Sequence, residues 1–387
     1  MYNRKSLLSL LRFPIKQKKT VSSRKYRRAI LIFFFLIHPF GNYNAENLFA
    51  VLVERKIGFM DRSGKLVVPP QFDDVTPIMY PFFEGLTRVY KAGKCGYIDE
   101  AGKAAIPVEY LECYPFREGL AVVVKGKSES PDCMEYRYLI DREGNTVFGP
   151  STDFFGAISE GRIPIDRGGI RTCSGPMGTY SSGKFGYIDR SGKEILAPQY
   201  DYASHFQGGV ATVRKGKYYG VINYDFSEML PFEFDHIGLF NEGLTQVRRK
   251  EEWAVADTKG NIRIGFGKFH FIESFYDGVA QACLATENSS RECKRVLIDS
   301  EGRVLIHLRD LYVHNFSEGL APAAKSNRSD VWGFIDKEGN WVIPPKFKAA
   351  YPFKKGLALV AVYDRKTFKD KFGYIDRSGK FVWQPSN

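Results

Sequence analysis

The chain repeats one short pattern nine times, and this repetition constrains its fold more than any other feature. Each copy centres on an aspartate, replaced once by asparagine, that is followed in most copies by glycine three residues later. These anchors are Asp61, Asp99, Asp141, Asp189, Asn223, Asp257, Asp299, Asp336 and Asp376. They recur about every 40 residues, a period typical of repeat architectures in which neighbouring units share a core.

A second motif precedes each anchor and reads Glu-Gly-Leu in its commonest form, as at residues 84–86 and 118–120. The residues between the motifs predict three antiparallel strands in each unit. The first follows Glu-Gly-Leu, the second ends at the anchor aspartate, and the third runs into Pro-Pro-x-Phe, where proline favours a strand end. Asp and Gly in the anchor motif suit a tight hairpin turn.

We therefore expect an all-β repeat protein of about nine three-stranded antiparallel units. Closure into a propeller-like ring would remove exposed strand edges, whereas the alternative, an open β-solenoid, needs polar caps that neither terminal unit provides. We expect the anchor aspartates to form turns rather than bind metal, and the Glu-Gly-Leu glutamates to make local backbone bonds. The regularly placed aromatic residues should pack between units; they include Tyr97, Phe116, Tyr187, Phe206, Phe240, Phe316, Phe334, Phe353 and Tyr374.

The fullest copy, at residues 332–347, reads Trp-Gly-Phe-Ile-Asp-x-x-Gly and then Val-Ile-Pro-Pro-x-Phe, and Phe-x-x-Gly-Leu-Ala follows it. This spacing resembles the bacterial WG (KWG) repeat family over roughly residues 46–385. Only Trp332 supplies a tryptophan before glycine, and the units around Asp141, Asp257 and Asp299 lack that glycine. The resemblance implies a non-catalytic binding or scaffold module.

A basic segment precedes the repeats. Residues 1–28 hold ten of the 56 basic residues, and the first acidic residue is Glu46. Nine apolar residues follow at 29–37, too few for a membrane span and typical of a secretory signal. We expect residues 1–45 to be a basic segment plus signal peptide, and residues 46–387 to be a WG-repeat β domain that is periplasmic, surface-exposed or secreted. An uncleaved N-terminal membrane anchor is the alternative.

The six cysteines form no C-x-x-C pair, so zinc is not expected, and their even number suits an oxidising compartment. Cys283 and Cys293 lie in one enlarged hairpin connection and are the best candidate disulfide. Cys133 with Cys173 is a weaker candidate, and Cys95 with Cys113 is weaker still.

The units vary in length in one connection, between the first and second strands. In a repeat array such insertions lie on one rim, and loops on a rigid scaffold often bind ligands, although surface loops also accept neutral insertions. The candidate binding residues in these insertions are Lys127, Glu129, Asp132, Arg171, Tyr180, Arg291, Arg328, Asp330, Arg365 and Lys369.

Without the N-terminal segment the chain carries 46 basic and 44 acidic residues, which argues against a nucleic-acid-binding groove. No recognised catalytic or nucleotide-binding motif is present. We therefore expect no enzymatic activity, metal or cofactor, and a protein or peptide partner bound through the variable rim. A glycan of the cell surface bound by the repeated aromatic residues is one alternative, and an enzyme with a site assembled across repeats is another.

Overall fold

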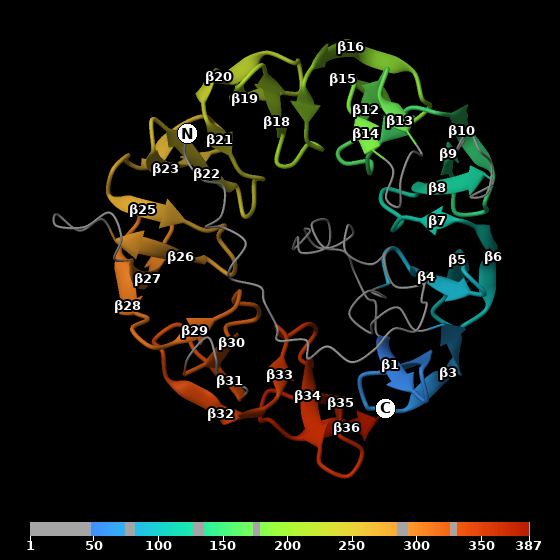
Figure 1. Ribbon diagram of the computed structural model, residues 1–387, viewed down its shortest axis with the longest axis vertical. Coiled ribbons are helices and arrows are strands. Elements are labelled where there is room, and N and C mark those ends of the chain that lie inside the picture. Colours follow the sequence, from blue (N-terminus) through green and yellow to red (C-terminus); the bar gives the residue numbers. More distant parts are fainter. Residues whose placement is uncertain are drawn as a thin grey trace. The chain divides into compact units, whose positions relative to one another are not determined.

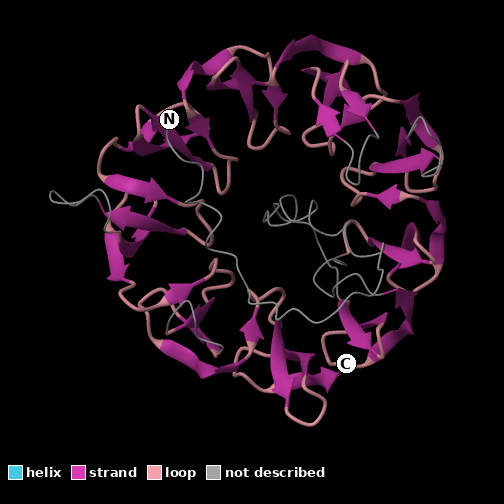
Figure 2. Ribbon diagram, in the orientation of Figure 1, coloured by secondary structure: helices cyan, strands magenta, loops and turns pink. Residues whose placement is uncertain are grey.

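The computed structural model describes residues 48–73, 82–126, 135–172, 179–284, 293–325 and 331–386. The chain divides into two units, Met1–His38 and Pro39–Asn387, and all described residues belong to the second. The expected basic segment and signal peptide, residues 1–45, lie outside the described residues. The described residues form strands and no helix (Figure 2).

Nine small antiparallel sheets follow one another around a ring and form a nine-bladed β-propeller (Figure 1). We number the blades in chain order. Within a blade, strand a is a short inner strand, strands b and c form the central hairpin, and strand d lies at the outer edge of the ring.

The strands have the following bounds. Blades 1 and 2 contain β1 (Phe49–Val53), β2 (Lys56–Met60) and β3 (Leu66–Asp73), then β4 (Leu86–Lys91), β5 (Lys94–Asp99) and β6 (Ala104–Tyr110). Blades 3 and 4 contain β7 (Glu112–Cys113), β8 (Ala121–Gly126), β9 (Glu135–Ile140) and β10 (Thr146–Ser151), then β11 (Phe154–Phe155), β12 (Arg162–Arg167), β15 (Lys184–Asp189) and β16 (Glu194–Tyr200). Between β12 and β15 lies a small hairpin of β13 (Ile170–Thr172) and β14 (Thr179–Ser181).

Blades 5 and 6 contain β17 (Tyr202–Ala203), β18 (Val210–Lys215), β19 (Tyr218–Asn223) and β20 (Glu228–Phe234), then β21 (His236–Ile237), β22 (Leu244–Arg249), β23 (Glu252–Asp257) and β24 (Ile262–Ile264). Blades 7 and 8 contain β25 (Phe269–Ile272), β26 (Val279–Leu284), β27 (Lys294–Asp299) and β28 (Val304–His307), then β29 (Tyr312–Val313), β30 (Ala321–Ala324), β31 (Trp332–Ile335) and β32 (Trp341–Phe347). Blade 9 contains β33 (Ala349–Ala350), β34 (Ala358–Asp364), β35 (Lys369–Ile375) and β36 (Phe381–Ser386).

The nine antiparallel units and their ring are confirmed, but the units are larger than expected. Blades 3 to 9 each have a fourth strand, strand a, whereas the described residues of blades 1 and 2 form three strands. Strand a has only two residues in most blades, which is too short to show an alternating sequence pattern. It pairs with strand b of its own blade, as Tyr202 does with Arg214.

The core lies between the blades. Each of the nine buried apolar clusters combines residues from two adjacent blades. Strand β8 is an example. Its residues Ala121 and Val123 face blade 2, whereas Val122 faces blade 4. A strand buried on both faces has no polar side, so the usual alternation is lost.

The ring closes through one of these clusters. Phe49 and Val51 of blade 1 pack with Leu357 and Tyr374 of blade 9. The Phe49 and Tyr374 ring centroids lie 5.5 Å apart, and the Tyr374 hydroxyl donates a hydrogen bond to the Ala50 carbonyl oxygen at 3.0 Å. The first and last blades therefore cover each other's apolar faces.

The glycine of the WG motif permits a close approach between strands c and d. A Cβ at Gly96 would lie 2.5 Å from the Pro107 carbonyl oxygen, where the β5–β6 register shifts. Blade 3 has Tyr138 in place of this glycine. The close approach of its strands c and d is instead permitted by Gly149 of strand d, where a Cβ would lie 2.6 Å from the Arg137 carbonyl oxygen. Blades 6 and 7, which lack both the glycine and Pro-Pro, have short outer strands, β24 and β28.

The Glu-Gly-Leu motif joins neighbouring blades, so our expectation of a local bond was wrong. Its first two residues form a tight turn before strand b, with φ of 49° at Glu118 and 77° at Gly119. We call it the clasp turn. The Glu84 carboxylate accepts hydrogen bonds from the N–H groups of Glu118 and Gly119 in the next blade, the latter at 2.8 Å. Among the described residues, five further carboxylates bond the next clasp turn in this way, those of Glu118, Glu160, Glu242, Asp277 and Glu318.

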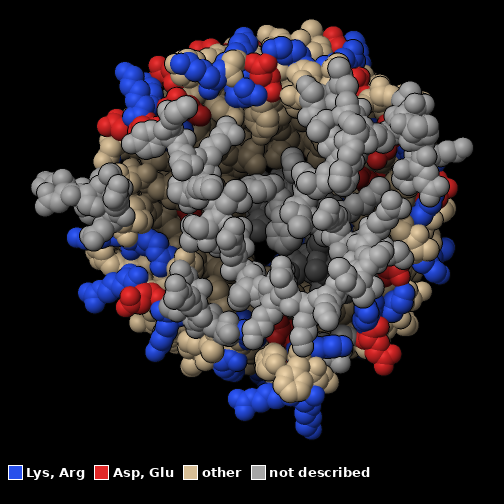
Figure 3. Space-filling model, viewed as in Figure 1, with Lys and Arg blue, Asp and Glu red and all other residues tan. Residues whose placement is uncertain are grey.

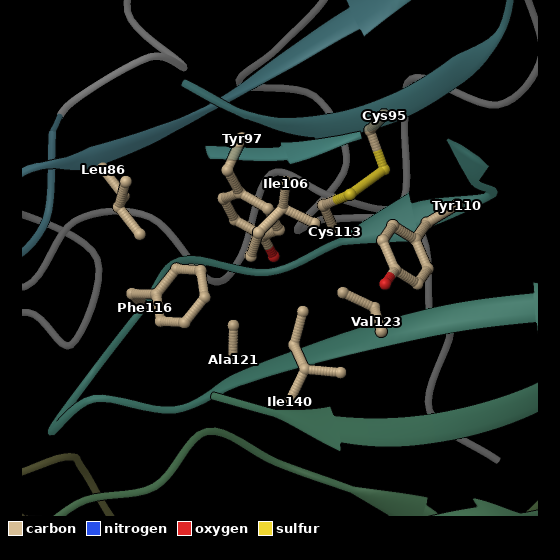
Figure 4. Close-up of a cluster of buried hydrophobic side chains, with 10 residues drawn as sticks. All are labelled: Leu86, Cys95, Tyr97, Ile106, Tyr110, Cys113, Phe116, Ala121, Val123 and Ile140. Carbon is tan, nitrogen blue, oxygen red and sulfur yellow. A yellow bond between two sulfur atoms is a disulfide. The ribbon is translucent and has the colours of Figure 1, made fainter. Parts of the chain in front are cut away.

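A disulfide adds a covalent link between blades 2 and 3. Cys95 of β5 and Cys113 of β7 are bonded and lie in the apolar cluster between these blades (Figure 4). Tyr97 and Phe116 pack edge to face in the same cluster, with ring centroids 4.8 Å apart.

Glu118→Ala should lower the free energy of unfolding by about 1–3 kcal/mol, because it leaves two backbone N–H groups of blade 4 without their carboxylate. Glu118→Gln should lose less, since its amide oxygen still accepts a hydrogen bond. Glu54→Ala is the control: Glu54 also has a positive φ, and no carboxylate bond from it to another blade is found among the described residues. Chemical denaturation measures the free energy of unfolding, which should fall most for Glu118→Ala, less for Glu118→Gln and least for Glu54→Ala. Equal decreases for Glu118→Ala and Glu54→Ala would contradict this prediction.

Cys95→Ser with Cys113→Ser should lower the free energy of unfolding of the oxidised protein by about 3 kcal/mol, the chain-entropy estimate for an 18-residue separation. Denaturation with and without reductant measures the loss, which should disappear when both proteins are reduced. Recovery of free Cys95 and Cys113 thiols from the exported wild-type protein by peptide mapping would contradict the pairing.

Candidate binding face

The ring has two faces with different connections. In blades 2 to 9 strand b starts at the clasp turn, and strand c returns to the anchor turn, Asp-x-x-Gly in all of these blades but blade 5, at the same end. Because six of the described clasp turns bond the clasp turn of the next blade, these turns lie together on one side of the ring, the turn face. The connections between strands b and c leave the opposite side, which we call the loop face.

The anchor aspartates act as turn formers. The Asp61 carboxylate accepts hydrogen bonds from the N–H groups of Ser63 and Lys65, at 2.8 and 3.0 Å. The Asn223 side chain accepts the same two bonds in blade 5. Among the described residues, no group of three or more His, Cys, Asp or Glu side chains is arranged to hold a metal ion.

The long insertions lie in the b–c connections of blades 3, 4, 7, 8 and 9, at residues 127–134, 168–183, 285–293, 325–331 and 365–368. Their attachment to the loop face agrees with the expectation of a single variable rim. Lengths also differ elsewhere: the segment between strand d and strand b of the next blade has nine residues from β16 to β18, twelve from β3 to β4 and fourteen from β24 to β26. Blades 1, 2, 5 and 6 have short b–c turns, so the insertions form two arcs with a short-turn sector on either side.

An aspartate at the end of the preceding blade holds three of the short turns. Carboxylates of Asp73, Asp201 and Asp235 accept hydrogen bonds from the N–H groups of Ala92, Gly216 and Lys250, at 2.7, 2.6 and 2.9 Å. At the equivalent place before blades 3 and 9, which carry insertions, the chain has Leu111 and Lys348. We did not identify this aspartate from the sequence, although its position directly after the aromatic residue Phe72, Tyr200 or Phe234 was a usable signal.

The insertion of blade 9 is the part of the expected binding rim that the structure describes throughout. Arg365 and Lys369 are exposed at the β34–β35 turn, and Phe368 between them has 78% of its surface exposed. Lys and Arg side chains project beyond the ring at this hairpin (Figure 3).

Asp364 stabilises this turn. Its carboxylate accepts hydrogen bonds from the Lys366 N–H at 2.9 Å and the Thr367 hydroxyl at 2.8 Å, and it pairs with Lys371 at 2.9 Å. The hydrogen bond from Lys371 is the largest cause holding the pKa of Asp364 well below its usual range. Asp364 and Asp370 flank the tip; Asp364 is paired with Lys371, and residues 365–369 between them carry three basic side chains and one phenylalanine.

The other candidate rim residues are described in part or not at all. Arg171 and Tyr180 are backbone partners in the β13–β14 hairpin. Lys127, Glu129, Asp132, Arg291, Arg328 and Asp330 lie outside the described residues. The structure therefore brings together Arg365 and Lys369 and pairs Arg171 with Tyr180, and it places no other members of the set.

Cys283 and Cys293 are bonded at the base of the blade 7 insertion, with Cα atoms 5.2 Å apart. Cys283 belongs to β26, and Cys293 directly precedes β27. The second candidate pair, Cys133 and Cys173, lies outside the described residues.

The loop face also has a hollow between blades 5 and 6 that we did not predict. It is lined by Tyr218, Phe232, Glu233, Asp235, Arg249, Lys250 and Glu252. Arg249 pairs with Glu233 on one wall, while the Asp235 carboxylate fixes the Lys250 turn. Charges of both signs beside aromatic rings suit the polar and apolar groups of a peptide.

The repeated aromatic residues named in the sequence analysis are all buried, with at most 8% of their surface exposed. They pack between blades, as Tyr187 packs on Phe206 and Phe334 on Phe353. This confirms the expected packing role and removes the observation that favoured sugar stacking.

The chain is similar to known proteins in two ways: its structure is similar to solved structures, and its sequence matches a repeat family. The most similar solved structures include a "Crystal structure of the eukaryotic initiation factor", with 13% identity, a TM-score of 0.48, and coverage of 89% of this chain and 97% of that one. They also include Hsv2 of Kluyvelomyces marxianus, with 8% identity, a TM-score of 0.32 and coverage of 76% and 95%. The extracellular domain of the putative hybrid two component system BT3049 from B. thetaiotaomicron shows 10% identity, a TM-score of 0.28 and coverage of 89% and 56%.

A search of curated proteins gives no match. The model of the WG containing repeat matches residues 57–95, 96–127, 185–219, 219–253, 253–284 and 332–364, which together make up more than half of the chain. Five of these six segments begin at the residue before a WG-type glycine or at that glycine, and the sixth begins at Trp253, which precedes Ala254. With nine registered repeats, nine blades and these six matches, the chain belongs to the WG-repeat family.

Proposed function

We propose that this protein is a non-catalytic, extracytoplasmic binding or scaffold protein that engages a protein or peptide partner through its loop face. The observation that carries the proposal is the separation of constant and variable connections. Clasp turns and anchor turns repeat around one face, while the long b–c insertions all leave the other. A rigid ring that varies at one face is the usual design of a binding scaffold.

The described surface of the loop face suits a protein partner. Phe368 supplies an exposed apolar side chain, and Arg365 and Lys369 beside it supply charge. An aromatic side chain next to arginine is typical of the residues that contribute most to protein interfaces. The hollow between blades 5 and 6 adds mixed charges on the same face.

Two further observations support the extracytoplasmic part of the proposal. Disulfides persist mainly in oxidising compartments, and the structure pairs Cys95 with Cys113 and Cys283 with Cys293. The basic and apolar residues before Glu46 have the form of a secretory signal. In the part of the chain that the structure describes, no helix is long and apolar enough to cross a membrane.

Arg365→Glu combined with Phe368→Ala should weaken partner binding by tenfold or more, since it reverses a charge and removes the exposed ring at the β34–β35 tip. Wild-type and variant protein, exported and purified whole, would be compared in pull-downs from envelope extracts with quantitative mass spectrometry. The control is Lys380→Glu, an exposed lysine of the same blade on the turn face.

A partner captured by wild type and Lys380→Glu but lost from the tip variant supports the proposal. Equal capture by all three proteins would contradict a role for this part of the loop face. A glycan array with the wild-type protein tests the alternative ligand class, and a specific glycan signal without any protein partner would replace the proposal.

A further inference from the structure

Among the described clasp turns of blades 3 to 9, that of blade 6 lacks the carboxylate that fills the other six. Among the seven blade junctions from blade 2 to blade 9, six have a carboxylate oxygen bonded to the clasp-turn glycine of the following blade. At the turns of blades 3, 4, 5 and 7 the carboxylate also accepts the N–H of the residue before that glycine. The exception is the junction between blades 5 and 6, where Gly208 occupies the position of the glutamate and has no side chain.

The unfilled turn has the same backbone as the filled ones. Glu242 and Gly243 have φ of 52° and 78°, compared with 49° and 77° at the filled turn of Glu118 and Gly119. Two successive residues in this conformation direct their N–H groups to one side and form a small anion-binding concavity. The Glu242 carboxylate does not compete for it, because it accepts hydrogen bonds from Asp277 and Gly278 of blade 7.

The unfilled turn is also more open to solvent than most filled ones. Glu242 and Gly243 are both exposed, whereas Glu118 and Gly119 are half-buried. In three other blades a long cation from the following blade lies over the clasp turn: Arg190 over Glu118, Lys337 over Asp277 and Arg377 over Glu318. Beside Glu242 the equivalent residue is Ser300, whose hydroxyl bonds Glu301 instead.

We infer that the Glu242–Gly243 turn is a binding site for a carboxylate supplied from outside the chain, the acidic side chain of a peptide or protein segment. The molecule itself demonstrates the chemistry, since six carboxylates occupy the same kind of turn at neighbouring junctions. Hydrogen bonds to a charged acceptor are stronger than neutral ones. The site lies on the turn face, so it is separate from the loop face and does not depend on the proposed function.

Binding of one carboxylate to two exposed N–H groups is weak, with a dissociation constant on the order of millimolar. The site therefore anchors one acidic residue within a larger contact. Its probe is acetyl-glutamate N-methylamide, and acetyl-glutamine N-methylamide is the matched neutral probe.

The experiment is a titration of the full exported protein, labelled with ¹⁵N-glycine, followed through the backbone amide signals. The Gly243 amide should shift saturably with the glutamate probe and much less with the glutamine probe. Gly119, whose N–H is already bonded to Glu84, and Gly93, in a b–c turn of the loop face, should not shift.

Two variants make the assignment specific. Gly208→Glu restores the missing carboxylate, so it should abolish the Gly243 shift and raise the melting temperature. Gly208→Ala adds the same Cβ, which meets the Thr258 methyl at 3.2 Å, but no carboxylate, and it should keep the shift.

Loss of the shift in Gly208→Glu but not in Gly208→Ala supports the site. An unchanged shift in both variants, or equal shifts with the two probes in the wild type, would overturn it. If Gly208→Glu does not fold, the comparison of the two probes on the wild-type protein still decides the question.

Discussion

Each sheet of this protein is apolar on both faces and too small to cover either one alone, and the rest of the structure follows from this constraint. Val122 contacts one neighbouring blade while Ala121 and Val123 contact the other. A linear stack would leave one apolar face exposed at each end. Packing Phe49 and Val51 against Leu357 and Tyr374 covers both ends at once, so ring closure is the way this chain buries its last two faces.

Polar groups then fix how neighbouring blades sit on each other. A non-glycine residue at positive φ costs on the order of 1 kcal/mol, yet Glu118 and Glu160 both adopt this conformation. The conformation lets each residue do two things: its N–H helps to bind the carboxylate of the preceding blade, and its own carboxylate binds the following one. Because apolar packing is not directional, these directed bonds account for the regular succession of the blades.

This arrangement leaves the loop face free to vary. Lengthening a b–c connection does not disturb the clasp, which lies at the other end of the same strands. The chain holds short turns with Asp73, Asp201 and Asp235, and it lacks this aspartate before blades 3 and 9, where the turn is replaced by an insertion.

The ring, the number of units and the buried aromatic residues could be predicted because each depends on a pattern repeated nine times. Strand a could not, since two residues such as His236 and Ile237 carry no periodic signal. The target of the glutamates also could not, because the sequence shows that Glu84 recurs but not that its partner lies 34 residues ahead in another blade. Of the candidate binding residues, Arg365 and Lys369 could be placed on the exposed rim from the insertion alone, while the exposure of Phe368 depends on the way Asp364 shapes the turn.

The most direct test of the closed ring is the distance between its first and last blades. Nitroxide labels at positions 65 and 380 would lie on the turn faces of blades 1 and 9, close to the place where Gly64 meets the Val382 carbonyl. Pulsed electron spin resonance should give one short distance, comparable to that between adjacent packed sheets, about 10 Å apart, plus the length of the labels. An open array of nine units would separate the labels by roughly 80 Å, from eight such spacings, and a distance of that order would contradict closure.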